Sequence, residues 1–437
     1  MMLKAGFARM DITPPMGSYV SGYFSERYAK GVLDPIQLNA VAFSDGEATD
    51  LIISADLIGV DRITCDALRT EIAACTGIDR DHIMLTALHP HTSYAFLDMN
   101  FKKARGEKIV PTDELYCKML HLKYCDVAKM ALDDMHEATL GYAEEETAEQ
   151  IAFVRRYYMK DGTVATNPWN RVDEIVRPCE TPDNTVRLLR FAREGKNDIA
   201  LVNFCTHPDV IGGEYLSADW PGLVRRYVEK DLGGVSCLLL NGCQGDSNHC
   251  DWVGGKRGGY VHAAHMGRVI ADTVLKLWNA TNPQDFLHVA GGVHTVVVPT
   301  RTEGAEEYDK CVRFLEDHHA NRLSYKPTGA ELGRAGRITR LRTAPAFQQV
   351  PVSVLRLGDF AFVGFGGEPF THYGIAVREN CPDVTVITAC CANGYEGYLP
   401  TAKALTEGGY EANSSPFTPD LEEKCVAAAT ELIQTLL

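Results

Sequence analysis

The sequence predicts an α/β fold built from layers of sheet and helix. Segments rich in β-forming residues alternate with helical patterns along the whole chain, which is typical of layered α/β proteins. The chain has 437 residues, 45% of them hydrophobic, and it contains no internal repeat, low-complexity tract or long linker. We therefore expect one unit over residues 1–437 that carries insertions, instead of separable domains.

In the first half of the chain, a hairpin and a helix have the clearest signals. Strands are predicted at 36–43 and 51–58, joined by Ser44-Asp45-Gly46, because an Asp-Gly pair supplies the positive φ angles of a hairpin turn. Hydrophobic periodicity predicts a helix at 62–74 that ends at Gly77. The other elements expected here are strands at 82–88, 184–191 and 199–206 and a long amphipathic helix at 112–135.

In the second half, strands and helices continue to alternate. A helix is predicted at 220–231, where Pro221 suits the first turn. Helices at 305–319 and 329–341 form the expected excursion from the core, an insertion at about 303–342. The remaining elements are expected as strands at 235–240, 287–298 and 384–388, a hairpin at 350–365 around Gly358-Asp359, and helices at 261–278, 369–379 and 421–437.

Charge and composition exclude several classes of protein. The formal net charge of −15 argues against binding to nucleic acid or to an anionic membrane. No apolar run reaches the roughly 18–20 residues of a membrane helix, and the N-terminus has no apolar leader segment. The 14 cysteines are scattered without a C-x-x-C pair, so reduced, mostly buried thiols are expected. We expect a cytoplasmic protein that acts on a small molecule, without a nucleic-acid partner or stable membrane insertion; its oligomeric state is left open.

The common catalytic motifs are absent, and polar residues at the ends of predicted strands take their place. There is no G-x-S-x-G elbow, phosphate-binding loop, G-x-G-x-x-G turn or H-E-x-x-H helix. His89 and His91 follow an apolar strand, and their side chains point to the same side of an extended chain. A His-x-His pair at a strand end is a common source of zinc ligands. The alternative is a partly exposed loop with two unconnected histidines.

Three further segments offer candidate side chains, each with an ordinary structural alternative. His207 ends another apolar run, where a single histidine is usually a structural residue with satisfied hydrogen bonds. Glu368 follows two glycines that allow close backbone approach, but a glutamate there also suits a helix start. Tyr398 and Tyr410, twelve positions apart, could simply pack in the core.

Taken in order, these segments resemble the neutral, non-lysosomal ceramidase family, also called neutral/alkaline ceramidases. They are spread over nearly the whole chain, so coincidence is a poor explanation. The matching segments are residues 8–15 with Ser21-Gly22-Tyr23, 85–93, Thr206-His207-Pro208, 217–222, 242–248, Gly367-Glu368-Pro369-Phe370 and Tyr395-x-x-Tyr398.

The resemblance implies the fold of a ceramidase catalytic domain, with layered mixed β-sheets flanked by helices, and a mononuclear Zn²⁺ amidase. His91 would lie near the metal without binding it and would be the first choice of general acid. Tyr410 would face the scissile carbonyl. Arg171, with Asn170, would contact polar groups of the substrate, and Ser247 would correspond to a substrate-contacting serine. By position, the implied zinc ligands are His89, His207, Glu368 and Tyr398.

Departures from the family pattern concern the substrate more than the chemistry. Thr92-Ser93-Tyr94-Ala95 replaces the family's Ser-Gly-Pro-Gly, Gly245–His249 is one residue shorter than its counterpart, and the sequence has no C-terminal immunoglobulin-like domain. We expect a zinc-dependent hydrolase that cleaves an amide (N-acyl) bond with metal-activated water, on a substrate other than membrane ceramide. Hydrolysis of a lactone, ester or glycoside conjugate at the same site is one alternative, and a non-catalytic binding relic is another.

A second, competing metal site is also conceivable from spacing alone. His249, Cys250, His262 and His265 lie within a short span, and the last two are three positions apart on a predicted helix. Histidines at that helical spacing more often cover a surface, and the family resemblance does not include them. His318-His319 is expected to be a solvated helix face.

Overall fold

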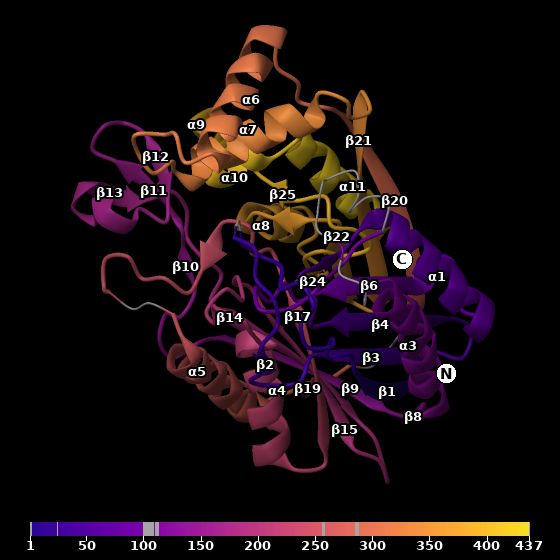
Figure 1. Ribbon diagram of the computed structural model, residues 1–437. Coiled ribbons are helices and arrows are strands. Elements are labelled where there is room, and N and C mark those ends of the chain that lie inside the picture. The colour runs from indigo at the N-terminus through magenta and orange to yellow at the C-terminus, as the bar shows by residue number, and fades with distance from the viewer. Residues whose placement is uncertain are drawn as a thin grey trace.

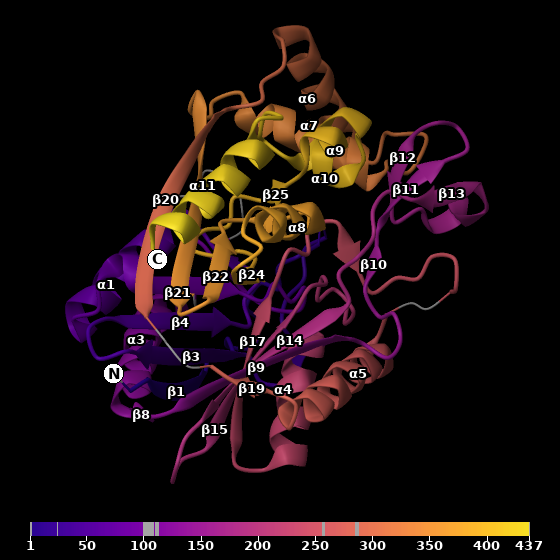
Figure 2. The same ribbon diagram turned by 180° about the vertical axis from the view of Figure 1, so that it is seen from behind.

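Three large mixed sheets occupy the centre of the molecule, with helices packed around them (Figures 1 and 2). The computed structural model describes residues 2–23, 25–98, 109, 113–255, 258–284 and 288–436. Within these ranges the strand orders are β6-β4-β3-β1-β8, β17-β15-β14-β9-β19 and β20-β21-β22-β24. The predicted α/β class is therefore confirmed.

The first sheet is built around the predicted hairpin. β3 and β4 pair antiparallel and are almost entirely buried, and the turn between them has Gly46 at a φ of 97°. β4 pairs parallel with β6, and helix α1 (Arg62–Thr76) connects the two before it ends at Gly77 in the left-handed conformation. α3 (Asp113–Asp133) contacts β1 and β3. The strands are β1 (Lys4–Asp11), β3 (Gln37–Ser44), β4 (Thr49–Ala55), β6 (Ile83–Ala87) and β8 (His136–Glu137).

The second sheet contains a parallel pair, β15 and β17, joined by helix α4 (Asp219–Leu232). α4 and α5 (Tyr260–Trp278) pack together, and Trp220 of α4 meets Phe204 edge-on in the core beneath them. Pro221 lies in the first turn of α4, as predicted. The strands are β9 (Thr139–Glu146), β14 (Thr185–Ala192), β15 (Asp198–Phe204), β17 (Val235–Asn241) and β19 (Asn282–Pro283).

The third sheet contains the hairpin predicted at 350–365, with Gly358 at its turn. α8 (Thr371–Asn380) connects the parallel strands β22 and β24, and α11 (Leu421–Thr435) packs against β20 and β21. The strands are β20 (Val289–Pro299), β21 (Phe347–Leu357), β22 (Phe360–Phe365) and β24 (Thr385–Ala389).

The three sheets meet at the carboxyl ends of their parallel strands. The Asn203 amide of β15 donates to the carbonyl of Thr388 in β24, 3.0 Å away. The backbone N–H of Leu85 in β6 donates to the Asn393 side chain beyond β24, at 2.9 Å. Since loops at such ends are where α/β proteins place their ligands, the junction is the expected position of a site.

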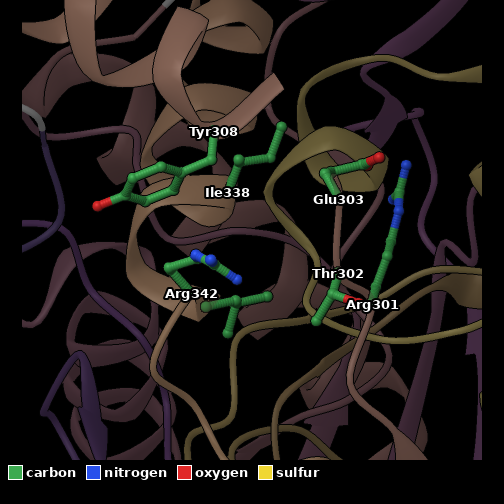
Figure 3. A pocket seen from close by; sticks show the side chains of 7 residues that line it. Arg301, Thr302, Glu303, Tyr308, Ile338 and Arg342 are labelled. Atoms are coloured by element: carbon green, nitrogen blue, oxygen red, sulfur yellow. The ribbon is translucent and has the colours of Figure 1, made fainter. Parts of the chain in front are cut away.

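Two helices project from the third sheet at the top of Figure 1. They are α6 (Ala305–His319) and α7 (Gly329–Leu341), with the bounds expected from the sequence. At their base lies a hollow of ≈ 30 Å³, bounded by Tyr308 and Ile338 on the helical side and Arg301 on the other (Figure 3). That volume holds little more than one or two water molecules, so this hollow is not a substrate site.

The structure adds elements that the sequence patterns did not predict. β1 and β9 were missed because their buried positions are few and interspersed with charged residues, as in the Glu144–Glu146 end of β9. The outermost positions expected for three elements, residues 112, 287 and 437, lie outside the described residues. All fourteen cysteines are free thiols, and all but Cys75 and Cys125 are buried. Among the described helices, none combines the length and apolarity of a membrane span.

Candidate metal centre

His89 is fixed directly after β6 by two contacts to one loop. Its backbone has a φ of 73°, a left-handed conformation that is rare for a residue with a side chain. The backbone N–H donates to the carbonyl of Leu57 at 3.0 Å, and the ring Nδ1 donates to the carbonyl of Ile58 at 2.5 Å. The ring is buried. Because Nδ1 carries the proton, Nε2 of this imidazole presents a lone pair to the interior.

His207 is held in the same manner after β15. Its Nδ1 donates to the backbone carbonyl of Gln244 at 2.8 Å, and the residue is fully buried. The side chain of Asn241 links the loop that carries His207 to the loop that carries His89. It accepts from the Thr206 N–H at 3.2 Å and donates to the Leu88 carbonyl at 3.1 Å. One buried amide therefore sets the relative position of the two histidine-bearing loops.

Glu368 enters from the third sheet. It begins β23 (Glu368–Pro369), which pairs in parallel with β25 (Tyr398–Leu399), so that Glu368 is opposite Tyr398. The glycines before it are required by close packing, since a Cβ on Gly367 would lie 2.5 Å from the carbonyl oxygen of Gly397. Oε2 of Glu368 lies 3.4 Å from Nε2 of His89 and 3.1 Å from Nε2 of His207.

Nε2 of His89, Nε2 of His207 and Oε2 of Glu368 face one another. Burial, opposed by the charge of Glu368, lowers the pKa of His89 to about 4, so its imidazole is neutral at pH 7. Burial raises the pKa of Glu368, but His89, His207 and Arg155 together lower it to about 2, so the carboxylate is ionised. Nε2 of His207 and Oε2 of Glu368 have no hydrogen-bond partner. Buried acceptors that face one another without a donor are costly, and a cation bound between them would remove that cost.

His91 supplies a third imidazole. One nitrogen from each of His89, His91 and His207, which we call the histidine cluster, lies within 4.8 Å of the others. Both ring nitrogens of His91 are buried without a hydrogen-bond partner, and burial holds its pKa well below the usual range. Within the described residues, this is the one group of three or more histidine, cysteine or acidic side chains that could hold a metal.

The donor set fits zinc. Structural and catalytic zinc sites use imidazole nitrogens and carboxylate oxygens at about 2.0–2.2 Å in a tetrahedron, which places neighbouring ligands roughly 3.3 Å apart. The separations of 3.1 and 3.4 Å between Glu368 and the two imidazoles agree with that spacing. The Nδ1–H contacts to backbone carbonyls are the support that ligating histidines usually have.

Tyr398 and Tyr410 lie beside the cluster. The Tyr398 ring stacks on His207 at 6.4 Å between centroids and meets the Tyr410 ring edge-on at 5.5 Å. Burial raises the pKa of Tyr398 above its ordinary value, while the neighbouring Arg155 opposes that shift. Burial also raises the pKa of Tyr410 to about 12, so this phenol keeps its proton at neutral pH.

Ser247 and Arg171 have different surroundings. Ser247 is buried, and its hydroxyl donates at 3.4 Å to the Gln244 carbonyl that also accepts from His207. The Arg171 guanidinium is about one-third exposed and forms ion pairs of 2.6 Å with Asp161 and Glu174. The structure therefore brings Ser247 beside the site and pairs Arg171 with surface acids; the substrate contact implied for Arg171 stays a prediction.

Arg155 is the site residue that sequence reasoning missed. It is buried, its guanidinium carbon lies 5.3 Å from the Tyr398 ring centroid, and its Nε pairs with Glu411 at 2.8 Å. A signal was present, since Arg155 and Arg156 interrupt an otherwise apolar and aromatic stretch from 151 to 159. Buried arginines need partners, and that placement marks them as more than surface charges.

The second histidine group, His249, Cys250, His262 and His265, does not form a metal site in the described structure. His249 has its Nδ1 on Asp209 at 3.0 Å and its Nε2 at 3.4 Å from the Cys250 thiol. His265 pairs with Glu149 at 2.6 Å and is nearly half exposed. His249 and His265 each have a carboxylate of their own, and their ring nitrogens do not converge with other possible metal ligands in the described residues.

The overall architecture is that of neutral ceramidases. The chain matches over 100% of its length the crystal structure of neutral ceramidase from Pseudomonas aeruginosa, with a TM-score of 0.73, 15% identity and 75% of that chain covered. It also matches a ceramidase complexed with C2, with a TM-score of 0.75, 14% identity, and 100% and 76% of the two chains covered. No protein-family model and no curated protein sequence matches it. At this identity the likeness establishes the fold and confirms the resemblance at that level.

Proposed function

We propose that this protein is a zinc-dependent hydrolase that cleaves an amide (N-acyl) bond of a small molecule. The observation that carries the proposal is the convergence of Nε2 of His89, Nε2 of His207 and Oε2 of Glu368, with the carboxylate oxygen 3.1–3.4 Å from the two imidazole nitrogens. The shared fold with neutral ceramidases supports amide hydrolysis over other reactions.

In this proposal His89, His207, Glu368 and Tyr398 hold the ion. When bound, zinc supplies Lewis acidity that activates water and stabilises negative charge on a carbonyl oxygen. His89 follows β6 of the first sheet, His207 follows β15 of the second and Glu368 follows β22 of the third, which supports residues 1–437 acting as one catalytic unit. Gln244 and Ile58 keep the two imidazoles in the tautomer with a free Nε2.

His91 and Tyr410 act on the substrate. Tyr410 keeps its phenol proton at neutral pH and can donate it in a hydrogen bond to the carbonyl oxygen as charge develops, a contact worth about 3–4 kcal/mol. His91 is a neutral imidazole whose two nitrogens have no protein partner, so it can hold a proton for the leaving amine. Ser247 lies beside His207 and supplies a hydroxyl at the pocket wall.

The loop after His91 supports a substrate other than membrane ceramide. Ser93 donates to the Pro90 carbonyl at 2.9 Å, and the Tyr94 hydroxyl donates to Asp113 at 3.0 Å. Thr92, Ser93 and Tyr94 are all buried. These polar contacts hold the loop in place, and its sequence departs from the family's Ser-Gly-Pro-Gly. This departure is our reason to propose a substrate other than membrane ceramide.

Metal content and activity measured on the same sample test the proposal. We expect one zinc per chain and turnover of soluble chromogenic N-acyl compounds, both lost in His207→Ala. His265→Ala, which removes an exposed histidine of the second group, is the matched control and should retain both. Turnover of lactones or esters with no turnover of any amide would change the substrate class. Far less than one zinc per chain would contradict the enzyme proposal.

A further inference from the structure

The helix α7 lies directly against the short helix α10 (Tyr410–Ser414), and the two are adjacent in both Figure 1 and Figure 2. A Cβ built on Gly333 would overlap Oγ of Ser414 and lie 3.2 Å from Cε2 of Tyr410. One turn earlier, a Cβ on Gly329 would lie 3.7 Å from Cδ2 of Tyr410. The backbone of α7 therefore packs against Cδ2 and Cε2 of the Tyr410 ring, and a side chain at position 333 would force Ser414 or Tyr410 to shift.

Two arginines hold the other end of α10. Arg301 donates to the carbonyl of Ala412 at 2.7 Å, and Arg337 of α7 donates to the carbonyl of Asn413 at 3.0 Å. Carbonyls at the end of a helix lack partners within it, and a cation there is favourable. Arg337 is itself buried and also pairs with Glu303 at 3.1 Å.

The opposite side of α10 is equally constrained. Thr166 accepts from the backbone N–H of Tyr410 at 3.1 Å and donates to the Glu411 carboxylate at 2.7 Å. Glu411 has no exposed surface and pairs with Arg155. Beside the Arg301–Glu303 segment, the hollow of Figure 3 offers only ≈ 30 Å³. α10 is therefore held between α7 and the Arg155 network with little space to shift.

We propose that α7, through Gly333 and Arg337, positions the Tyr410 side chain toward the histidine cluster. Residues 303–342 would then control the rate of turnover and leave metal binding unchanged. This inference rests on the proposed function, in which Tyr410 donates a hydrogen bond to the substrate carbonyl. Gly333 and Arg337 touch neither substrate nor metal in this proposal; they are positioning residues.

Two alanine substitutions on the same helix form the test. In Gly333→Ala the new methyl pushes on Ser414 and Tyr410, whereas in Gly336→Ala it meets nothing within 4 Å. Both changes replace glycine by alanine within the same helix, so they raise helix propensity to a similar extent. We expect Gly333→Ala to lower kcat by about 10- to 100-fold, the usual cost of displacing a catalytic group by up to 1 Å. KM and zinc content should stay within about twofold, and Gly336→Ala should resemble the wild type.

Two further variants separate positioning from general damage. Removing the obstructing hydroxyl in Gly333→Ala/Ser414→Ala should restore most of the lost kcat. In a Tyr410→Phe background, adding Gly333→Ala should lower kcat by less than about a further twofold, because the hydroxyl that Gly333→Ala misplaces is already absent. Arg337→Lys keeps the cation but cannot contact Asn413 and Glu303 together, and should lower kcat severalfold if Gly333→Ala proves too unstable to purify.

A spectroscopic readout keeps the inference distinct from the proposed function. With 3-fluorotyrosine at position 410, the ¹⁹F resonance should shift in Gly333→Ala and return in the double variant with Ser414→Ala, while Gly336→Ala leaves it in place. If the wild type hydrolyses no acyl compound, the proposed function fails and the ¹⁹F result still reports whether α7 positions Tyr410. If the wild type is active and the two alanine variants have equal kcat and equal ¹⁹F shifts, the inference is wrong.

Discussion

The histidine cluster and the second histidine group have opposite electrostatic character. In the first, burial lowers the pKa of His89 to about 4 and keeps the pKa of His91 far below normal, so both imidazoles are neutral at pH 7. In the second, burial would lower the pKa of His249, but the hydrogen bond and charge of Asp209 raise it to about 10. One group of histidines could hold a metal ion, whereas the electrostatics of the other favour a protonated His249.

The difference lies in what each Nδ1 contacts. His89 and His207 donate to backbone carbonyls, which are neutral and leave Nε2 free. His249 has its Nδ1 on a carboxylate, which favours the doubly protonated ring. Close spacing of histidines along the sequence is therefore a poor guide to a metal site. The group that Nδ1 contacts is a better guide, because it decides whether Nε2 is free to bind a metal.

The largest effect on metal binding and activity is expected for His207→Ala. The variant removes one of the two imidazoles that face Glu368, and we expect loss of bound zinc and a fall of hydrolytic activity to background. Metal analysis by mass spectrometry and a chromogenic acyl assay on one sample measure both. A variant that retained its zinc and its activity would place the metal elsewhere.

Glu368→Gln tests the convergence of lone pairs. An amide can donate a hydrogen bond to Nε2 of His89 or His207, so the metal-free variant should be more stable than the metal-free wild type by about 1–2 kcal/mol. Zinc affinity should fall by about 100-fold, because the anionic ligand is lost. Thermal unfolding with and without added zinc reports both effects. A variant less stable than the wild type without zinc would mean that the carboxylate is already satisfied.

His249→Gln tests the proton held in the second group. The pKa of His249 is about 10 in the folded protein and about 6.5 in the unfolded chain. Its stabilising effect is therefore complete below pH 6.5 and is lost as the pH rises through 10. We expect the unfolding free energy of the wild type to fall by about 4–5 kcal/mol more than that of the variant across this range. Urea denaturation at several pH values measures it; parallel curves would show that His249 is neutral.

Arg171→Ala should have the smallest effect. Its ion pairs with Asp161 and Glu174 are partly exposed, and such pairs contribute less than about 1 kcal/mol to stability. If Arg171 also contacts the substrate, as the family resemblance implies, KM should rise by about tenfold, as measured by steady-state kinetics on the best N-acyl substrate. An unchanged KM would contradict that substrate contact.

Much of the fold was predictable from local patterns. The bounds of α6 and α7 follow from periodicity alone, and the hairpin of β3 and β4 follows from alternation and the Asp45-Gly46 turn. β9 was missed because its acidic end has no local strand signal; it is held in place by pairing with β14. Such pairing depends on tertiary contacts that a single sequence does not display.

The site was predictable in part. His89, His91, His207 and Glu368 were chosen from ordered motifs, and the structure brings them together. The carbonyls of Ile58 and Gln244, which select the ring tautomers, leave no sequence signal, because every residue has a backbone carbonyl. Arg155 was overlooked since its significance comes from burial beside Tyr398, which only the packed structure reveals.

The most direct test of the central claim is an anomalous difference map at the zinc edge from crystals grown with stoichiometric zinc. We expect one strong peak within about 2.0–2.2 Å of Nε2 of His89, Nε2 of His207 and Oε2 of Glu368. A peak beside His249 and His262 instead, or no peak between the two imidazoles and the carboxylate, would contradict it.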